Sequence, residues 1–255
     1  MANVTHVRTQ YGLLEGRVVD GVHTFLGVPY AASLRLGRRF AQPQEPDAWT
    51  GTRPALTHGP VCPQVPTYGP VGHGATSVLN AGEDCLTLNI RTQDIHGKAP
   101  VLVWVHGGGY AVGSANERVL QSGAFAASGI VEVTLNYRLG ALGFLHLDDA
   151  PDNRGLLDII RALQWVRDNI AGFGGDPARV TLAGRSAGGF AVAPLMAMPE
   201  APGLFSPALI QSGATPAVLP MHFPHPTPQP FLSRPRPQLS ALAPAHLSTT
   251  LNPPP

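Results

Sequence analysis

The 255-residue chain carries 17 Lys and Arg against 16 Asp and Glu, a formal net charge of +1, and 44% of its residues are hydrophobic. Its charged fraction of 13% is low for a soluble domain, and no cluster of Lys and Arg provides the electrostatic footprint of a nucleic-acid or anionic-membrane partner. The length suits one large α/β domain or two small ones, with enough chain to bury a core.

Membrane insertion and secretion are not indicated by the sequence. No apolar run approaches the ~18 residues that cross a bilayer, and the best candidate, residues 101–105, has the length of a strand. The N-terminal residues "MANVTHVRTQ" lack the apolar segment of a signal peptide. We therefore expect a cytoplasmic protein without a membrane partner.

The first predicted element is a β-hairpin. Two apolar segments, residues 17–19 and 22–25, flank Asp20 and Gly21. Both central positions of a two-residue hairpin turn favour positive φ, which Asp-Gly accommodates.

Strands and helices alternate further along the chain. The segments 101–105 ("VLVWV") and 131–137 ("VEVTLNY") predict buried strands, and residues 180–183 and 207–213 predict two more. Between them, residues 155–170 place their apolar side chains on one helical face: Leu156, Ile159, Ile160, Leu163, Val166 and Ile170. Hairpins followed by strand–helix alternation predict a mixed sheet whose central part is parallel.

The C-terminal residues have a different composition. Residues 221–255 contain ten prolines, and no Asp or Glu follows Glu200. Prolines at this density block helices and central strands, so extended or disordered chain is expected there. We predict a folded domain over residues 1–214 and a proline-rich, disordered tail over 215–255.

The segment "GRSAGG" (184–189) has the form G-x-S-x-G and stands between a predicted strand and a predicted helix. In that context it places a nucleophilic serine, here Ser186, on a sharp turn with the amide of Ala187 directed at the reacting centre. A glycine-rich loop is the alternative interpretation, because this short motif is weak evidence by itself.

The segment "HGGGY" (106–110) directly follows the strand at 101–105. Consecutive glycines let backbone N–H groups face a developing oxyanion, whereas an ordinary turn needs one or two glycines at most. His106 lies within this segment, so we expect it to support the loop and not to act as the catalytic base.

These motifs and their neighbours make the chain resemble the type-B carboxylesterases, a branch of the α/β-hydrolases that includes cholinesterases and bacterial aryl esterases. The resemblance covers about residues 5–214 in the family's order. The blocks that carry it are "FLGVPYA" (25–31), "RRFAQP" (38–43), "GPVCPQ" (59–64), "EDCLTLNI" (83–90), "PVLVWVHGGGYAVGS" (100–114), "NYRLGALGFL" (136–145), "GLLDIIRALQWVRDNIAGFGGDPARVTLAGRSAGG" (155–189) and "GLFSPALIQSG" (203–213).

The resemblance implies a mostly parallel α/β-hydrolase sheet with N-terminal antiparallel hairpins, lacking its C-terminal side. It also implies a small carboxylic ester as substrate and neither cofactor nor metal. Ser186 matches the nucleophile, and Gly108, Gly109 and Ala187 match the oxyanion hole. Scaffold roles are implied for two ion pairs and two cysteines: Arg39 with Glu83, Arg138 with Asp176, and Cys62 with Cys85.

The cysteine pairing has two interpretations. Joined, Cys62 and Cys85 would close a loop of about two dozen residues, worth roughly 3 kcal/mol in the chain-entropy description. Without a secretion signal, two reduced buried thiols are equally consistent with the sequence.

The chain departs from the family pattern near Ser186. Arg185 stands where the family usually has Glu, and Pro194 lies about two turns into the helix that follows, where we expect a kink costing around 3 kcal/mol.

The partners that Ser186 needs are also missing. In this fold the triad runs Ser, then Asp or Glu, then His, yet the only later acid is Glu200, which lies too near Ser186. The later histidines all lie in the proline-rich tail: His222, His225 and His246.

The sequence therefore predicts the N-terminal portion of a serine ester hydrolase with weak or no activity. One alternative is a non-catalytic interaction module on the same fold, and another is a frameshifted product of a complete esterase gene.

Overall fold

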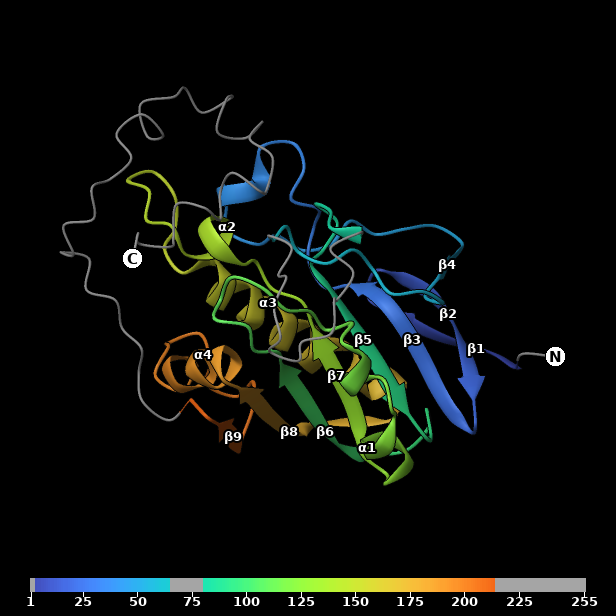
Figure 1. Ribbon diagram of the computed structural model, residues 1–255. Coiled ribbons are helices and arrows are strands. Elements are labelled where there is room, and N and C mark those ends of the chain that lie inside the picture. Colours follow the sequence, from blue (N-terminus) through green and yellow to red (C-terminus); the bar gives the residue numbers. More distant parts are fainter. Residues whose placement is uncertain (1–2, 65–79, 214–255) are drawn as a thin grey trace.

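The computed structural model describes residues 3–64 and 80–213, and the predicted tail over 215–255 lies outside the described residues (Figure 1). A nine-stranded sheet forms the centre of the molecule. Its strands are β1 (Asn3–Thr9), β2 (Gly12–Val19), β3 (Val22–Pro29), β4 (Thr52–Pro54), β5 (Thr87–Thr92), β6 (Ala99–Val105), β7 (Val131–Leu135), β8 (Gly175–Arg185) and β9 (Ala208–Gln211). The α-helices are α1 (Ala124–Ala127), α2 (Gly140–Phe144), α3 (Arg154–Asn169) and α4 (Ala187–Leu195).

The sheet is mixed, as predicted. The strand order is β1-β2-β3-β5-β7-β6-β8-β9, and β4 pairs with β2. Pairing is antiparallel from β1 through to β7, and β7, β6, β8 and β9 are mutually parallel. Parallel strands covered on both faces become buried along their whole length, and every residue of β7 is buried.

The hairpin prediction is confirmed. Val19 pairs with Val22, and Asp20 and Gly21 adopt φ angles of 51° and 77°. Positive φ at both central residues matches the turn to the right-handed twist of its strands.

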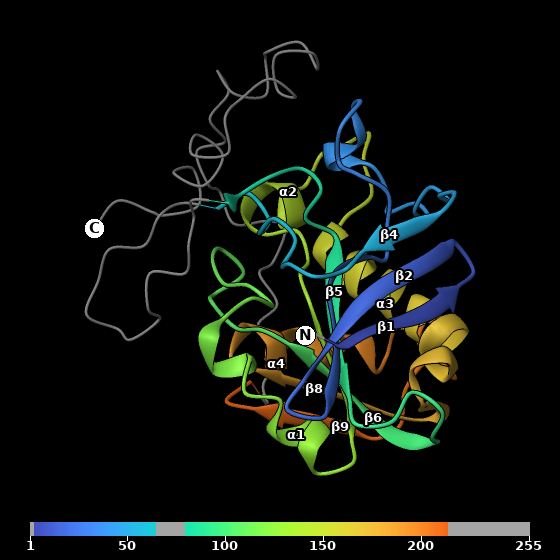
Figure 2. The same ribbon diagram turned by 90° about the vertical axis from the view of Figure 1, so that its right-hand side faces the viewer.

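The helix predicted over 155–170 forms as α3, and a 3₁₀ turn over Ile170–Phe173 continues it. Helices α3 and α4 lie side by side against β8, and the short α1 packs on β5 and β7 across the other face (Figures 1 and 2). Trp165, Val166 and Phe173 anchor the α3 segment in the core.

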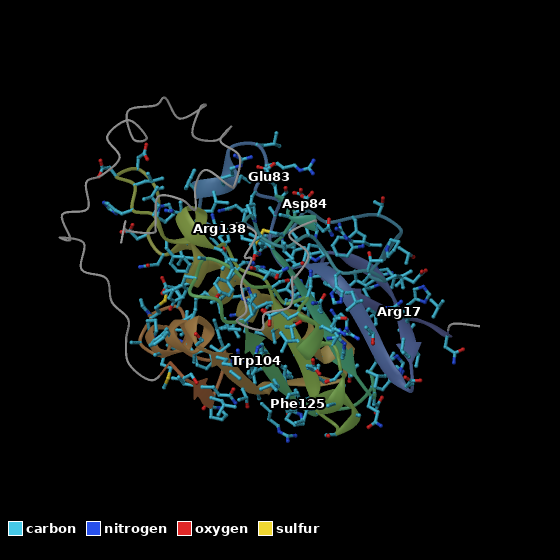
Figure 3. All side chains as sticks on the ribbon, viewed as in Figure 1. Arg17, Glu83, Asp84, Trp104, Phe125 and Arg138 are labelled. Carbon is cyan, nitrogen blue, oxygen red and sulfur yellow. A yellow bond between two sulfur atoms is a disulfide. The ribbon has the colours of Figure 1, made fainter. Side chains whose placement is uncertain are left out.

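One predicted ion pair is wrong. Arg138, labelled in Figure 3, pairs with Asp158 of α3 and not with Asp176. Its Nη2 lies 2.7 Å from Asp158 Oδ1 and its Nε 2.8 Å from Oδ2. Arg138 follows the carboxyl end of β7, whereas Asp176 lies at the amino end of β8, where Gly175 pairs with Ala99. The length of the parallel strands therefore separates Arg138 from Asp176.

The Arg138–Asp158 pair is fully buried and joins three segments. The remaining guanidinium nitrogen, Nη1, donates to the carbonyls of Arg39 and Ala41 at 3.0 and 2.7 Å. The other predicted pair, Arg39 with Glu83, is present in the structure near the same segment (Figure 3).

Asp158→Asn is expected to lower the free energy of unfolding by about 3–5 kcal/mol, because it leaves a buried guanidinium without its counter-charge. Asp176→Asn is the control, since among the described residues Asp176 accepts a hydrogen bond from the Ala178 amide alone, which an Asn side chain can keep. Urea unfolding followed by tryptophan fluorescence measures both. Equal losses in the two variants would contradict the assignment.

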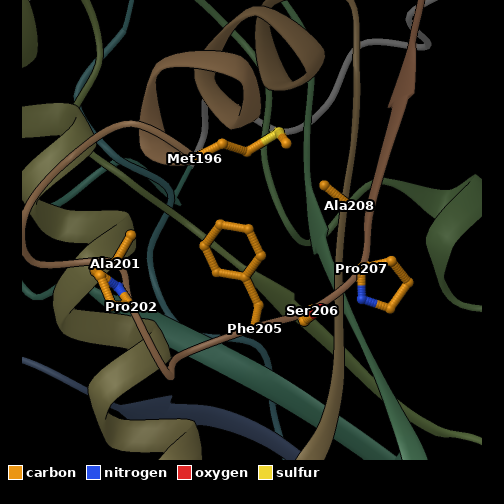
Figure 4. A pocket seen from close by; sticks show the side chains of 7 residues that line it. All are labelled: Met196, Ala201, Pro202, Phe205, Ser206, Pro207 and Ala208. Carbon is orange, nitrogen blue, oxygen red and sulfur yellow. The ribbon is translucent and has the colours of Figure 1, made fainter.

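Strand β9 forms one edge of the sheet, and no other described strand pairs with its outer side. Apolar side chains gather there: Met196 and Leu209 are exposed, and a shallow hollow lies beside the strand (Figure 4). The residues that line the hollow are Met196, Ala201, Pro202, Phe205, Ser206, Pro207 and Ala208. An unpaired apolar edge is a template for association with another chain.

Leu209→Lys is expected to reduce aggregation of the purified chain, because charge on an edge strand opposes further strand pairing. The control is Leu36→Lys, at a side chain that is 91% exposed but far from β9 in sequence, against 46% exposure for Leu209. Static light scattering over a concentration series compares them. If both substitutions reduce scattering equally, net charge and not the β9 edge controls association.

Candidate active site

Ser186 occupies a strained turn between β8 and α4. Its φ and ψ are 55° and −122°, which a residue with a side chain rarely adopts. Two backbone hydrogen bonds of 2.8 Å hold it: the Ser186 amide donates to the Gln211 carbonyl, and the Phe190 amide donates to the Ser186 carbonyl. Such conformations cost about 1–3 kcal/mol and persist where the surroundings enforce them, as at nucleophile elbows.

The glycine segment after β6 lies against this turn. Strands β6 and β8 are parallel and in register, with Val105 opposite Gly184, so both segments leave the sheet at the same edge. Gly107 lies close against the turn, because a Cβ there would lie 2.7 Å from the Arg185 carbonyl oxygen and 3.3 Å from Ser186 Cβ. Only glycine permits that spacing.

The predicted oxyanion amides belong to the same neighbourhood. Gly108 and Gly109 have φ angles of 117° and 62°, and Ala187 is the first residue of α4. Within residues 3–64 and 80–213, the amides of these three residues donate no hydrogen bond to the protein. Free amides beside a helix N-terminus suit an anion, so their role as the oxyanion hole stays a prediction consistent with this geometry.

His106 is built into the base of the glycine loop. Its ring is buried, stacks on Tyr137 with centroids 4.5 Å apart, and places Nδ1 2.8 Å from the Gly107 carbonyl oxygen. Because a carbonyl only accepts, Nδ1 carries the proton. Burial lowers the pKa of His106 to about 4, against the opposing effect of that hydrogen bond, so the ring is neutral near pH 7. These contacts agree with a supporting role.

Tyr137 holds the His106 backbone through a hydrogen bond. Its hydroxyl donates to the His106 carbonyl at 3.0 Å, and burial raises the pKa of Tyr137, so the hydroxyl keeps its proton. The start of the glycine loop is thus fixed from β7 as well as from β6.

The other predicted residues lie as follows. Cys62 and Cys85 are joined as a disulfide, and Arg185 is exposed beside Ser186. Pro194 is the penultimate residue of α4, which ends at Leu195, so one helical residue follows the proline.

No partner for the Ser186 hydroxyl is present in the part of the chain that the structure describes. None of the histidines or carboxylates within residues 3–64 and 80–213 hydrogen-bonds to Ser186 Oγ, and Glu200 is exposed beyond α4. His222, His225 and His246 lie outside the described residues. The same described ranges contain no group of three potential metal ligands and no helix long and apolar enough to cross a bilayer.

Sequence reasoning missed two residues that matter here. Asp158 lies outside the apolar stripe of α3 named above, so the helical spacing gave no signal that its carboxylate is buried. Gln64 ends the "GPVCPQ" block, and nothing in its sequence context indicated that it reaches the glycine loop.

The lowered pKa of His106 predicts a pH-dependent stability. The folded ring resists protonation down to about pH 4, whereas the unfolded ring binds a proton below about pH 6.5, so stability falls as the pH drops through that window. This group alone is expected to remove about 2 kcal/mol between pH 7 and pH 5.

His106→Asn keeps a donor near Nδ1 and does not titrate, so the pH dependence of the variant is expected to be flatter by that amount. Urea unfolding at pH 5, 6 and 7 measures the difference, and the remaining histidines are common to both chains. Parallel pH profiles would exclude a buried neutral His106.

A strained serine after a parallel strand, beside a glycine loop from the neighbouring strand, is typical of the α/β-hydrolase fold. Comparison with known proteins agrees. The model of the carboxylesterase family matches residues 3–227, and this chain belongs to that family.

Individual relatives give the same result. The para-nitrobenzyl esterase of Bacillus subtilis is 44% identical over 220 residues, which cover 83% of this chain and 45% of that protein. Neuroligin-2 of Mus musculus is 39% identical and covers 81% of this chain and 30% of that protein. A solved structure of PNB esterase superposes with a TM-score of 0.78 at 43% identity, over 82% of this chain and 44% of that one. The chain spans less than half the length of these relatives.

Proposed function

We propose that this domain carries the acyl-transfer site of a carboxylic ester hydrolase, with Ser186 as the nucleophile. The supporting observation is that Ser186 stands on a strained turn directly against Gly107 of the glycine loop. Relatives named as esterases, such as the para-nitrobenzyl esterase, support the reaction class.

In this proposal Ser186 Oγ attacks the carbonyl carbon of a small carboxylic ester. The carbonyl oxygen becomes an oxyanion that accepts hydrogen bonds from the amides of Gly108, Gly109 and Ala187. Collapse expels the alcohol and leaves an acyl-serine, which water hydrolyses to the acid. In this scheme the loop and helix residues bind the ester and stabilise the oxyanion, and the reaction requires no cofactor.

The proton of the Ser186 hydroxyl limits this chemistry. Within the described residues no imidazole is placed to accept it, and His106 donates its Nδ1 proton to Gly107 instead. Proteases that lose triad residues retain about 10³–10⁴-fold catalysis over water from the oxyanion hole and binding. We therefore propose that this 255-residue chain hydrolyses esters only at a trace rate.

Hydrolysis of p-nitrophenyl acetate by the purified chain is expected to turn over well below about 1 s⁻¹, a low value for an enzyme. Ser186→Ala is expected to change this trace rate little, because the residual catalysis comes from the oxyanion donors and substrate binding and not from an unactivated hydroxyl. Normal turnover that disappears in Ser186→Ala would show a complete catalytic apparatus and overturn the trace-activity proposal.

The lack of an imidazole or carboxylate hydrogen-bonded to Ser186 Oγ among the described residues favours one second candidate, a non-catalytic interaction module. Such a role requires neither Ser186 nor the three glycines at 107–109. Prolonged exposure to a fluorophosphonate, with Ser186→Ala as control, separates the two. Phosphonylated Ser186 in the mass spectrum supports the esterase proposal, and an unmodified chain supports the interaction module.

The cellular compartment of this protein also stays a proposal. The sequence predicts the cytoplasm, whereas a formed Cys62–Cys85 disulfide is typical of oxidising compartments.

A further inference from the structure

The far end of the glycine loop is held by a single side chain. Gln64 accepts a hydrogen bond from the Gly113 amide at its Oε1, and its Nε2 donates to the Gly113 carbonyl, both at 2.9 Å. Among the described residues, Gln64 is the only side chain from outside the segment 106–113 that hydrogen-bonds to residues 107–113. The two bonds satisfy both backbone polar groups of Gly113, as pairing with a neighbouring strand would.

Gln64 is itself constrained. Its side chain is 8% exposed, and Nε2 also donates to the Cys62 carbonyl at 3.1 Å. Cys62 is bonded to Cys85, two residues before β5, which lies beside β7 in the sheet. The amide of Gln64 is therefore tied through the disulfide to the centre of the fold.

Gly113 connects Gln64 to His106 and Gly107, at the base of the loop, through close packing. Its φ is 113°, and a Cβ at this position would meet the Gly107 carbonyl oxygen and lie 2.5 Å from His106 Nδ1. Gly113 is thus packed on the His106–Gly107 peptide, and Gly107 is the residue that lies against Ser186. A shift of Gly113 would move the amides of Gly108 and Gly109 relative to Ser186.

We propose that Gln64 is a positioning residue for the oxyanion loop, and that the Cys62–Cys85 disulfide is what fixes Gln64. This inference rests on the proposed function of Ser186, and it assigns a role to the segment before the disulfide loop that the nucleophile motif does not include. Oxyanion stabilisation then depends on a bond that thiol reductants cleave.

Hydrogen exchange of the full chain tests the structural part without any need for activity. Gln64→Met fills the same volume and removes both bonds to Gly113. Exchange of the loop amides that donate hydrogen bonds, those of residues 111–113, is expected to accelerate about tenfold, while the amides of β6 and α3 keep their protection. The control is Gln121→Met, which removes an exposed Gln hydrogen bond to the Asn116 carbonyl and leaves the loop untouched.

The chemical part is tested by the rate of Ser186 phosphonylation, because a phosphonyl oxygen occupies the place of the oxyanion. Gln64→Met and mild reduction of the wild-type disulfide are each expected to slow labelling about tenfold, and reduction is expected to add little in Gln64→Met. Gln121→Met is expected to label at the wild-type rate.

Each outcome decides a different claim. Unchanged exchange over residues 111–113 in Gln64→Met would overturn the positioning role, and so would accelerated exchange with an unchanged labelling rate. Loss of protection in β6 and α3 as well would make Gln64 a residue of general stability, which also overturns the proposal. Absence of labelling in the wild-type chain would refute the esterase proposal alone, since the exchange result stands without it.

Discussion

The backbone of Ser186 is the constraint on which the rest of the structure depends. A residue with a Cβ is held at φ 55° because its amide donates to β9 and its carbonyl accepts from α4. The strained turn persists because β9 and α4 each supply one of these partners, so β9 is part of the site although it carries no chemistry. The parallel register of β6 with β8 then determines that the glycine loop leaves the sheet at this turn and nowhere else.

Polar groups in the interior serve the same purpose. Arg138 and Asp158 join the end of β7 to α3 in a buried pair. The neighbouring residue, Tyr137, donates a hydrogen bond to the His106 carbonyl. A buried ion pair does not by itself stabilise a fold more than apolar packing does, but it penalises any arrangement that separates its members. The Arg138–Asp158 pair therefore holds helix α3 next to the carboxyl end of β7. That strand end supports the glycine loop.

Local patterns predicted the local structure well. The Asp20-Gly21 turn, the α3 periodicity and the strand–serine–helix order each follow from short-range sterics and hydrophobic spacing, and the structure contains all three. Long-range polar pairs were harder. The Arg138 partner was taken from family resemblance and was wrong, because nothing in the spacing shows that Asp176 and Arg138 lie at opposite ends of parallel strands. Gln64 was missed for the same reason, since its contact with Gly113 spans a sequence separation of 49.

The central proposal is that Ser186 is a nucleophile held beside an amide cradle, with no imidazole among residues 3–64 and 80–213 placed to activate it. A crystal structure of the chain after reaction with a fluorophosphonate tests it most directly. The account predicts a phosphonyl oxygen about 3 Å from the amide nitrogens of Gly108, Gly109 and Ala187, with no imidazole in contact with Oγ of Ser186. An imidazole backed by a carboxylate at Oγ, or a phosphonyl oxygen directed away from those amides, would contradict it.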